Sequence, residues 1–295
     1  MMQAKRLIAI AAAAVLMGSG SVAGVAQDWA RAMLDKSPRH GEFVTLPEAS
    51  GRKLQVWVVY PQVKAKAPVV VMIHEIFGLS DWAKEMADEL AGAGYIVVEP
   101  DLLSGLGPAG PNKTLGTMDQ SGAGAAYVAA NPGGTEAFPD RSAVVRAVSS
   151  LPDAQVLADL DTAADYGKKL PAANGQLYVA GFCWGGGKSF LFATHRPDLS
   201  AAFVFYGTPP PADLMKNITT PVYGFYAGND ERVTSTVPQT EADMKAAGKT
   251  YDPVIYDGAG HGFMRAGEAP DANAANSAAR AQGFRRLVTL LGGVR

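Results

Sequence analysis

The chain has 295 residues, of which 48% are hydrophobic and 18% are charged. Such a chain has apolar surface to bury and enough length for a sizeable core, which excludes a disordered protein. Its 26 basic and 28 acidic residues give a net charge of −2, which leaves no basic field for a nucleic-acid backbone. One cysteine excludes an intrachain disulfide, and four histidines leave little material for a histidine-rich metal centre.

The N-terminus has the order of features of a secretory signal. A short basic stretch precedes the uncharged apolar run Leu7–Met17, which is too short to span a bilayer well. Small residues then lead to Gly24-Val25-Ala26, the pattern that precedes a cleavage site. We expect a signal peptide over residues 1–26, cleaved after Ala26 or, as second choice, after Ala23. A periplasmic or secreted protein follows, the alternative being an uncleaved anchor or a frayed helix.

The rest of the chain alternates predicted strands with predicted helices. The continuous apolar run Pro68–His74 is typical of a strand buried on both faces, and Ser80 is placed to cap the helix that follows it. Strands are predicted over 54–60, 68–74, 96–99, 177–182, 201–206, 221–227 and 253–256, and helices over 81–91, 153–170, 184–195, 238–247 and 274–291. This alternation predicts an α/β fold, with a mostly parallel central sheet and helices on both faces.

One segment breaks the alternation. Residues 102–140 are rich in Gly, Ala and Pro, and the connection is much longer than an ordinary βα loop. It leaves the carboxyl end of a predicted parallel strand, where open α/β sheets bind ligands. A lid or wall over a site and a disordered insertion are both compatible with this composition.

The lone cysteine lies in Gly181-Phe182-Cys183-Trp184-Gly185, between a predicted strand and a predicted helix. A cysteine without context is most often a small buried apolar residue. Here the flanking glycines and the strand–turn–helix context are those of a nucleophile elbow, where a strained turn exposes the reactive side chain. The following helix N-terminus favours the thiolate over the thiol.

A cysteine nucleophile needs an imidazole and an acid that orients the ring. His261 lies in a glycine-rich loop after the last predicted strand, whereas His195 closes a helix and His40 lies in a poorly patterned stretch. Asp230 follows the end of a strand and is favoured over Asp257, which precedes His261 in the same loop. The chain order nucleophile, acid, base is that of the α/β-hydrolase fold.

Four motifs in this order resemble the dienelactone hydrolase family: 74–78 (HEIFG), 181–186 (GFCWGG), 228–230 (GND) and 260–263 (GHGF). The resemblance covers the chain from about Val44 onwards. It implies an α/β-hydrolase with the triad Cys183, Asp230 and His261. It also implies that Glu75 neighbours the thiol and takes part in its activation, although a surface acid that caps a helix or forms an ion pair is the ordinary alternative for a glutamate. The backbone N–H groups of Ile76 and Trp184 would form the oxyanion hole.

The sequence differs from this family in the residues expected to bind the substrate. The resemblance implies two arginines that bind the carboxylate of a small anionic lactone. Arg265 stands where one of them is expected, but residues 100–105 (PDLLSG) lack the other, unless Arg141 or Arg146 replaces it. We therefore expect carboxylated lactones to be handled poorly compared with neutral esters, because arginine pairs hold carboxylates best.

Together these features predict a signal peptide followed by a single α/β-hydrolase domain over residues 27–295. The predicted activity is hydrolysis of a small ester or lactone through an acyl-enzyme on Cys183, with no metal or organic cofactor, no nucleic acid and no membrane contact after signal cleavage. The alternatives are a general carboxylesterase or thioesterase acting on another small acyl substrate, and an exported binding protein that keeps the fold without turnover.

Overall fold

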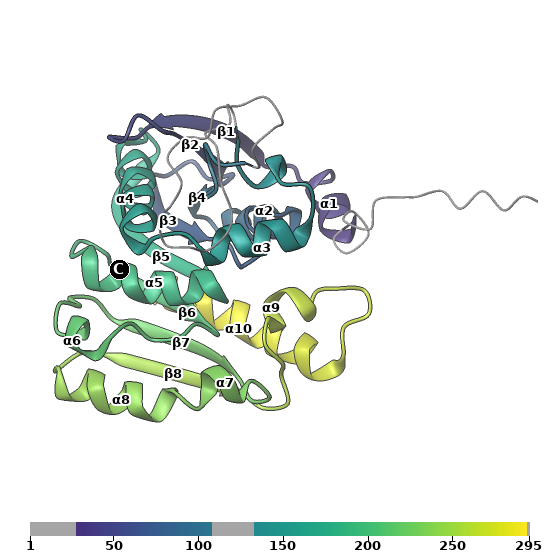
Figure 1. Ribbon diagram of the computed structural model, residues 1–295. Helices are drawn as coiled ribbons and strands as arrows, with labels where there is room; N and C mark the ends of the chain where they lie inside the picture. Colours follow the sequence, from purple (N-terminus) through teal and green to yellow (C-terminus); the bar gives the residue numbers. More distant parts are fainter. Residues whose placement is uncertain (1–27, 108–132, 294–295) are drawn as a thin grey trace, which may run out of the picture.

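The computed structural model describes residues 28–107 and 133–293, arranged as in Figure 1. The predicted signal peptide and most of the predicted insertion, 108–132, lie outside these residues. Eight strands form one sheet in the order β1-β2-β4-β3-β5-β6-β7-β8. The pairs β1–β2 and β2–β4 are antiparallel, and β3 to β8 are parallel. The predicted α/β fold with a mostly parallel sheet is confirmed.

The strands are β1 (His40–Pro47), β2 (Lys53–Tyr60), β3 (Ala67–Ile73), β4 (Ile96–Pro100), β5 (Ala173–Phe182), β6 (Ala201–Phe205), β7 (Val222–Ala227) and β8 (Tyr251–Tyr256). The longer helices are α2 (Asp81–Gly92), α3 (Arg141–Ser149), α4 (Asp153–Lys169), α5 (Trp184–His195), α8 (Val237–Ala246) and α10 (Ala274–Gly293). Shorter helical segments are α1 (Asp28–Leu34), α6 (Ala212–Met215), α7 (Glu231–Thr234), α9 (Phe263–Ala266) and the 3₁₀ turn η1 (Thr135–Ala137).

Helices cover both faces of the sheet (Figure 1) and create two apolar layers. Successive side chains of a strand point to opposite faces. In β3, Val69 and Val71 accordingly join the layer under α3, α4, α5 and α8, while Val70 and Met72 join the layer under α2 and α10. This explains the uninterrupted apolar run in the sequence, because both sets of positions are buried.

Several elements were not predicted, among them an edge strand and two helices that precede β1 and α4. Residues 40–47, which include His40, form the edge strand β1, and residues 28–34 and 141–149 are helices that the sequence pattern did not indicate. β1 pairs with β2 along its whole length, yet its side chains alternate only between exposed and half-buried. Because β1 buries no apolar stripe, it lacks the alternation that marks a strand in a sequence.

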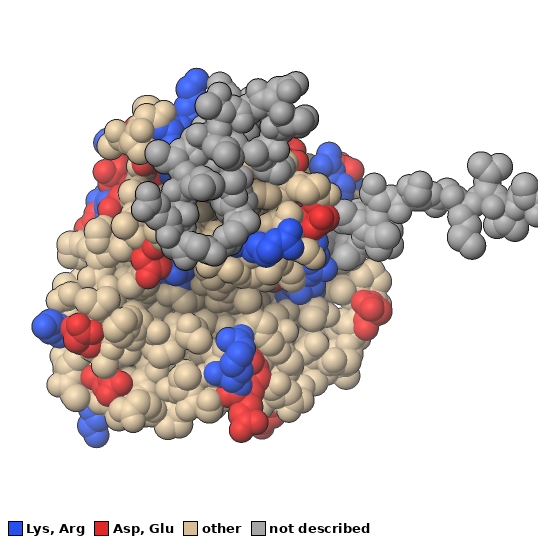
Figure 2. Space-filling model, viewed as in Figure 1, with Lys and Arg blue, Asp and Glu red and all other residues tan. Residues whose placement is uncertain are grey.

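Two further features of the described residues are the distribution of charge on their surface and the character of their helices. On the part of the surface that these residues form in Figure 2, lysines and arginines lie among aspartates and glutamates. In the described ranges, no helix combines the length and apolar character needed to cross a membrane.

Candidate active site

The turn between β5 and α5 holds Cys183. Its backbone has φ 56° and ψ −117°, a strained conformation for a residue other than glycine. A Cβ atom at Gly181 would lie 2.0 Å from the Gly185 carbonyl oxygen, and one at Gly185 would lie 2.4 Å from the His74 carbonyl oxygen. Only glycine fits at both positions, so the two glycines allow strand and helix to meet at the sharp turn that presents the sulfur.

The three side chains expected from separate loops come together at the carboxyl edge of the sheet. The Cys183 sulfur lies 3.0 Å from Nε2 of His261, and Nδ1 of the same ring lies 2.5 Å from Oδ2 of Asp230. Asp230 is only 7% exposed, whereas Asp257 and Glu231 are exposed. Asp230 is therefore the acid at hydrogen-bond distance from this imidazole.

The electrostatic surroundings of Cys183 differ from the expectation in one respect. Burial raises the pKa of the thiol, and the nearby Glu75 carboxylate raises it further. Hydrogen bonds from the backbone N–H groups of Trp184 and Ile76, and the charge of Arg232, lower the pKa but do not outweigh these two effects. The helix N-terminus acts in the predicted direction, yet the resting sulfur is favoured as a thiol.

Glu75 follows β3 directly and is buried, with 2% of its surface exposed. Nε of Arg265 lies 2.8 Å from a Glu75 carboxylate oxygen, as an ion pair whose N–H is not aligned for a hydrogen bond. Burial raises the pKa of Glu75, and the positive charges of Arg265 and Arg141 pull it back down. Glu75 is thus a buried carboxylate beside the sulfur, held by two cations rather than by solvent.

The structure places a second arginine beside Arg265. The Arg141 guanidinium lies over the Phe77 ring, 3.5 Å from its centroid, and that of Arg265 lies 5.2 Å from the same centroid. Burial, together with the charge of Arg265, lowers the pKa of Arg141. Of the two replacements considered for the missing arginine, Arg141, at the start of α3, is the one that lies beside Arg265, whereas Arg146 lies in the last turn of that helix.

The sequence analysis missed Tyr206, which follows β6 at the same edge of the sheet. It has φ 39° and a fully buried side chain, and its ring meets the His261 ring edge-on at 5.1 Å between centroids. Its position at the carboxyl end of the predicted strand 201–206 was the available signal, since residues at such strand ends line sites in α/β folds. Tyr206 forms a wall against the imidazole.

Comparison with known proteins identifies the family of this chain. The family model described as "Dienelactone hydrolase family" matches residues 54–294. The chain belongs to the dienelactone hydrolase family.

Individual members are only distantly similar in sequence. A "Putative carboxymethylenebutenolidase" from Methylorubrum extorquens is 31% identical over 66% of this chain and 63% of its own length. A "Carboxymethylenebutenolidase" from Pseudomonas putida is 28% identical over 68% of this chain and 77% of its own. The crystal structure of a "Putative Dienelactone Hydrolase" from Klebsiella pneumoniae superposes with a TM-score of 0.68 at 25% identity, covering 86% of this chain and 98% of that one.

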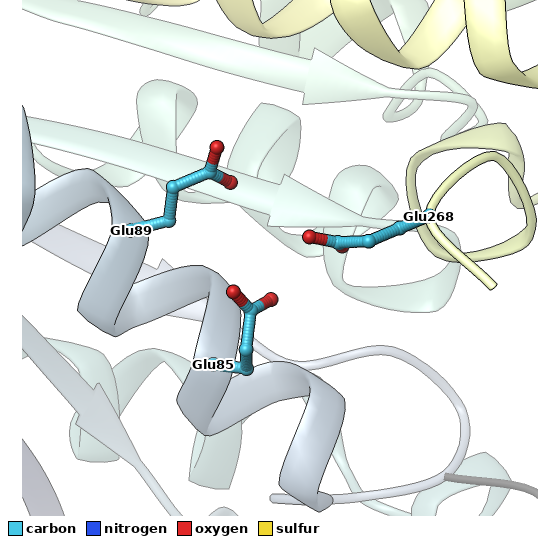
Figure 3. A group of neighbouring side chains, drawn as sticks. All are labelled: Glu85, Glu89 and Glu268. Atoms are coloured by element: carbon cyan, nitrogen blue, oxygen red, sulfur yellow. The ribbon is translucent and has the colours of Figure 1, made fainter. Parts of the chain in front are cut away.

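A second group of acids in this dienelactone hydrolase family member lies between α2 and the segment after α9. Figure 3 shows Glu85 and Glu89 projecting from α2 toward Glu268. Arg280 forms ion pairs with Glu89 and, at 2.9 Å, with Glu268, and the Trp82 indole N–H donates to Glu268 at 3.1 Å. These contacts make the group an ion-pair network that joins α2 to α10.

Proposed function

We propose that this protein hydrolyses a small ester or lactone through a thioester on Cys183, with His261 as the base and Asp230 as the acid that orients it. The observation that carries the proposal is the chain of contacts on the strained turn: 3.0 Å from sulfur to imidazole and 2.5 Å from imidazole to carboxylate. Nucleophile, base and orienting acid in mutual contact are the signature of covalent catalysis.

In the first half-reaction, the sulfur attacks the carbonyl carbon and the carbonyl oxygen becomes an oxyanion. The backbone N–H groups of Ile76 and Trp184, which lower the pKa of the Cys183 thiol, would stabilise that charge. The C–O bond then breaks, and the proton that left the thiol ends on the leaving oxygen. In the second half, His261 takes a proton from water, the hydroxide attacks the thioester, and the proton returns to the sulfur.

Glu75 is suited to accept the thiol proton during activation. The charges of Arg265 and Arg141 lower its pKa, so an anion that draws these arginines to itself would raise the pKa of Glu75 again. Once protonated, Glu75 no longer opposes ionisation of Cys183. Arrival of an anionic substrate is thereby coupled to formation of the thiolate.

The two arginines over Phe77 support an acyl substrate that carries its own negative charge. Arginine guanidinium groups bind carboxylates through charge-assisted, often paired, hydrogen bonds. We therefore replace the expected preference for neutral esters by a proposed preference for small anionic ones. The N-terminal pattern over residues 1–26 supports the further proposal that the enzyme acts in the periplasm or outside the cell.

Rapid mixing with a chromogenic ester tests the activity. The wild-type protein should release a burst of product followed by slower turnover, and Cys183→Ala should lose turnover at least a thousandfold while keeping its circular dichroism spectrum. A folded Cys183→Ala variant with undiminished activity would remove the proposed nucleophile. Absence of turnover in the wild-type protein across anionic and neutral esters would favour the non-catalytic binding protein instead.

Two matched substitutions on α3 test the proposed class of substrate. Arg141→Gln should lower kcat/KM for an anionic ester by roughly 10- to 150-fold, the equivalent of about 1.5–3 kcal/mol for one hydrogen bond to a charged group. Arg146→Gln, in the last turn of the same helix, should leave kcat/KM unchanged. Turnover of a neutral ester of similar size should change little in both variants, and a loss shared equally by both esters would refute the anionic substrate.

A further inference from the structure

His74 directly follows β3 and has no role in the chemistry described above. Its imidazole is fully buried and stacks on the Trp184 ring, with 5.8 Å between centroids and 13° between planes. Trp184 contributes one of the two N–H groups directed at the Cys183 sulfur, and Ile76, two residues after His74, contributes the other. The His74 ring therefore lies between the elements that carry both donors.

Hydrogen bonds fix which nitrogen of His74 carries the proton. The Leu102 backbone N–H donates to Nε2 at 3.3 Å, so Nε2 acts as an acceptor. Nδ1 lies 2.9 Å from the Glu75 carbonyl oxygen, which can only accept. Burial lowers the pKa of His74, which keeps the ring neutral. The neutral tautomer with the proton on Nδ1 satisfies both contacts.

The Glu75 carbonyl belongs to the same peptide group as the Ile76 N–H. In a trans peptide the C=O and N–H bonds point in opposite directions. A bond that draws the carbonyl toward His74 therefore turns the Ile76 N–H away from His74 and toward the sulfur. We propose that His74 is a positioning residue for the oxyanion hole, holding the Glu75–Ile76 peptide in the orientation that directs the Ile76 N–H at the reacting centre.

The proposal rests on the proposed hydrolase function and adds a residue to it. The Glu75 carbonyl also accepts from the Gly78 N–H at 3.1 Å. Without the His74 bond, this turn bond alone holds the Glu75–Ile76 peptide, and rotation of the peptide becomes easier. A rotated peptide would withdraw the Ile76 donor. Loss of one such donor slows acyl transfer by about 10²–10³.

Two substitutions at His74 separate this role from a general structural one. His74→Phe keeps a ring that can stack on Trp184 but loses the donor, while His74→Asn keeps an N–H donor at the position of Nδ1. The Phe variant should acylate 10²–10³-fold more slowly with KM little changed, and its Cys183 pKa, read from the pH dependence of alkylation, should rise because the sulfur loses the Ile76 N–H. The pH-independent rate of alkylation should stay near that of the wild type.

The Asn variant should recover most of the acylation rate and of the thiol pKa, and His195→Phe, on the exposed end of α5, should behave as the wild type. Equal losses in the Phe and Asn variants, or acylation within threefold of wild type in a folded Phe variant, would overturn the proposal.

A measurement on the wild-type protein covers the case in which the Phe variant does not fold. Nitrogen-15 NMR should show His74 protonated at Nδ1 and unprotonated at Nε2, and the opposite tautomer would overturn the proposal. This readout is separate from the activity: a wild-type protein without an acylation burst contradicts the proposed function, whereas a wrong tautomer or unresponsive His74 variants contradict only the role of His74.

Discussion

At the scale of single residues, the charges around Cys183 determine the pKa of its thiol. Burial and Glu75 hold the proton on the Cys183 sulfur, and the two backbone donors work against them. Burial raises the pKa of Glu75, and the charges of Arg265 and Arg141 lower it. The pKa of Cys183 therefore depends on Glu75, and the pKa of Glu75 depends on what surrounds the two arginines.

Glu75→Gln tests that balance. Removing the negative charge lowers the pKa of Cys183, so alkylation of the thiol at neutral pH should become faster than in the wild type. Ester hydrolysis should nevertheless fall by on the order of 10², because the acceptor for the thiol proton is lost. The exposed Glu231→Gln is the control, and slower alkylation in Glu75→Gln would mean that the carboxylate supports the thiolate instead of opposing it.

Asp230→Asn should reduce kcat by roughly 10²–10⁴ with little change in circular dichroism. The amide cannot balance the charge that His261 acquires when it takes a proton. Asp257→Asn is the matched control, since Asp257 is an exposed aspartate in the loop that carries His261. Equal effects of the two substitutions on kcat would contradict the assignment of Asp230.

At the scale of elements, Thr135 in η1 joins segments that are far apart in the chain. Its backbone N–H and hydroxyl donate to the Asp101 carboxylate at 2.7 and 2.9 Å, and its hydroxyl accepts from the Leu79 N–H at 3.0 Å. A Cβ atom at Gly78, which has φ +70°, would lie 2.4 Å from that hydroxyl. η1 leads into α3, so these bonds anchor the helix that carries Arg141.

Thr135→Val should therefore raise KM for an anionic ester several-fold more than KM for a neutral one. The valine loses the hydroxyl bonds and costs about 1–3 kcal/mol of stability through unsatisfied buried groups, which thermal unfolding would register. Thr135→Ser keeps the hydroxyl and should restore KM. Parallel changes in KM for both esters would show that Thr135 does not act through Arg141.

At the scale of the whole molecule, the network of Glu85, Glu89, Glu268 and Arg280 connects segments that lie far apart in the chain, with a separation of 191 residues between Glu89 and Arg280. Burial raises the pKa of Glu85 to about 9, and the charges of Glu268 and Glu89 contribute while Arg280 opposes them. An unfolded glutamate has a pKa of about 4.3. The folded protein therefore binds this proton more tightly, so its contribution to stability is largest in acid and is lost as the pH rises toward 9.

Glu85→Gln should flatten this dependence. The wild-type free energy of unfolding should decrease with pH between about 5 and 9, by up to about 1.4 kcal/mol per pH unit for one proton. An uncharged amide keeps a donor toward Glu268 without the titration, so the slope should be smaller in denaturant titrations across this range. Glu241→Gln, on the exposed face of α8, should keep the wild-type slope, and an unchanged slope in Glu85→Gln would contradict the raised pKa.

The sequence by itself determined the fold class, the elbow and the order of the candidate triad. Continuous apolar runs identify buried parallel strands because burial on both faces leaves no polar positions. The glycines beside Cys183 identify the turn because any Cβ there meets backbone. His261 and Asp230 were predictable because each follows a strand end, and parallel strands bring their carboxyl ends to one edge.

The tertiary structure alone decided what surrounds these groups. Edge strand β1 carries no apolar alternation, so only pairing with β2 reveals it. Arg141 lies far from Arg265 in sequence, and no local pattern shows that α3 brings both to Phe77. The raised pKa of Cys183 depends on the burial of the thiol and on the charge of Glu75, because a pKa follows from desolvation and from charges in space rather than from adjacency in the chain.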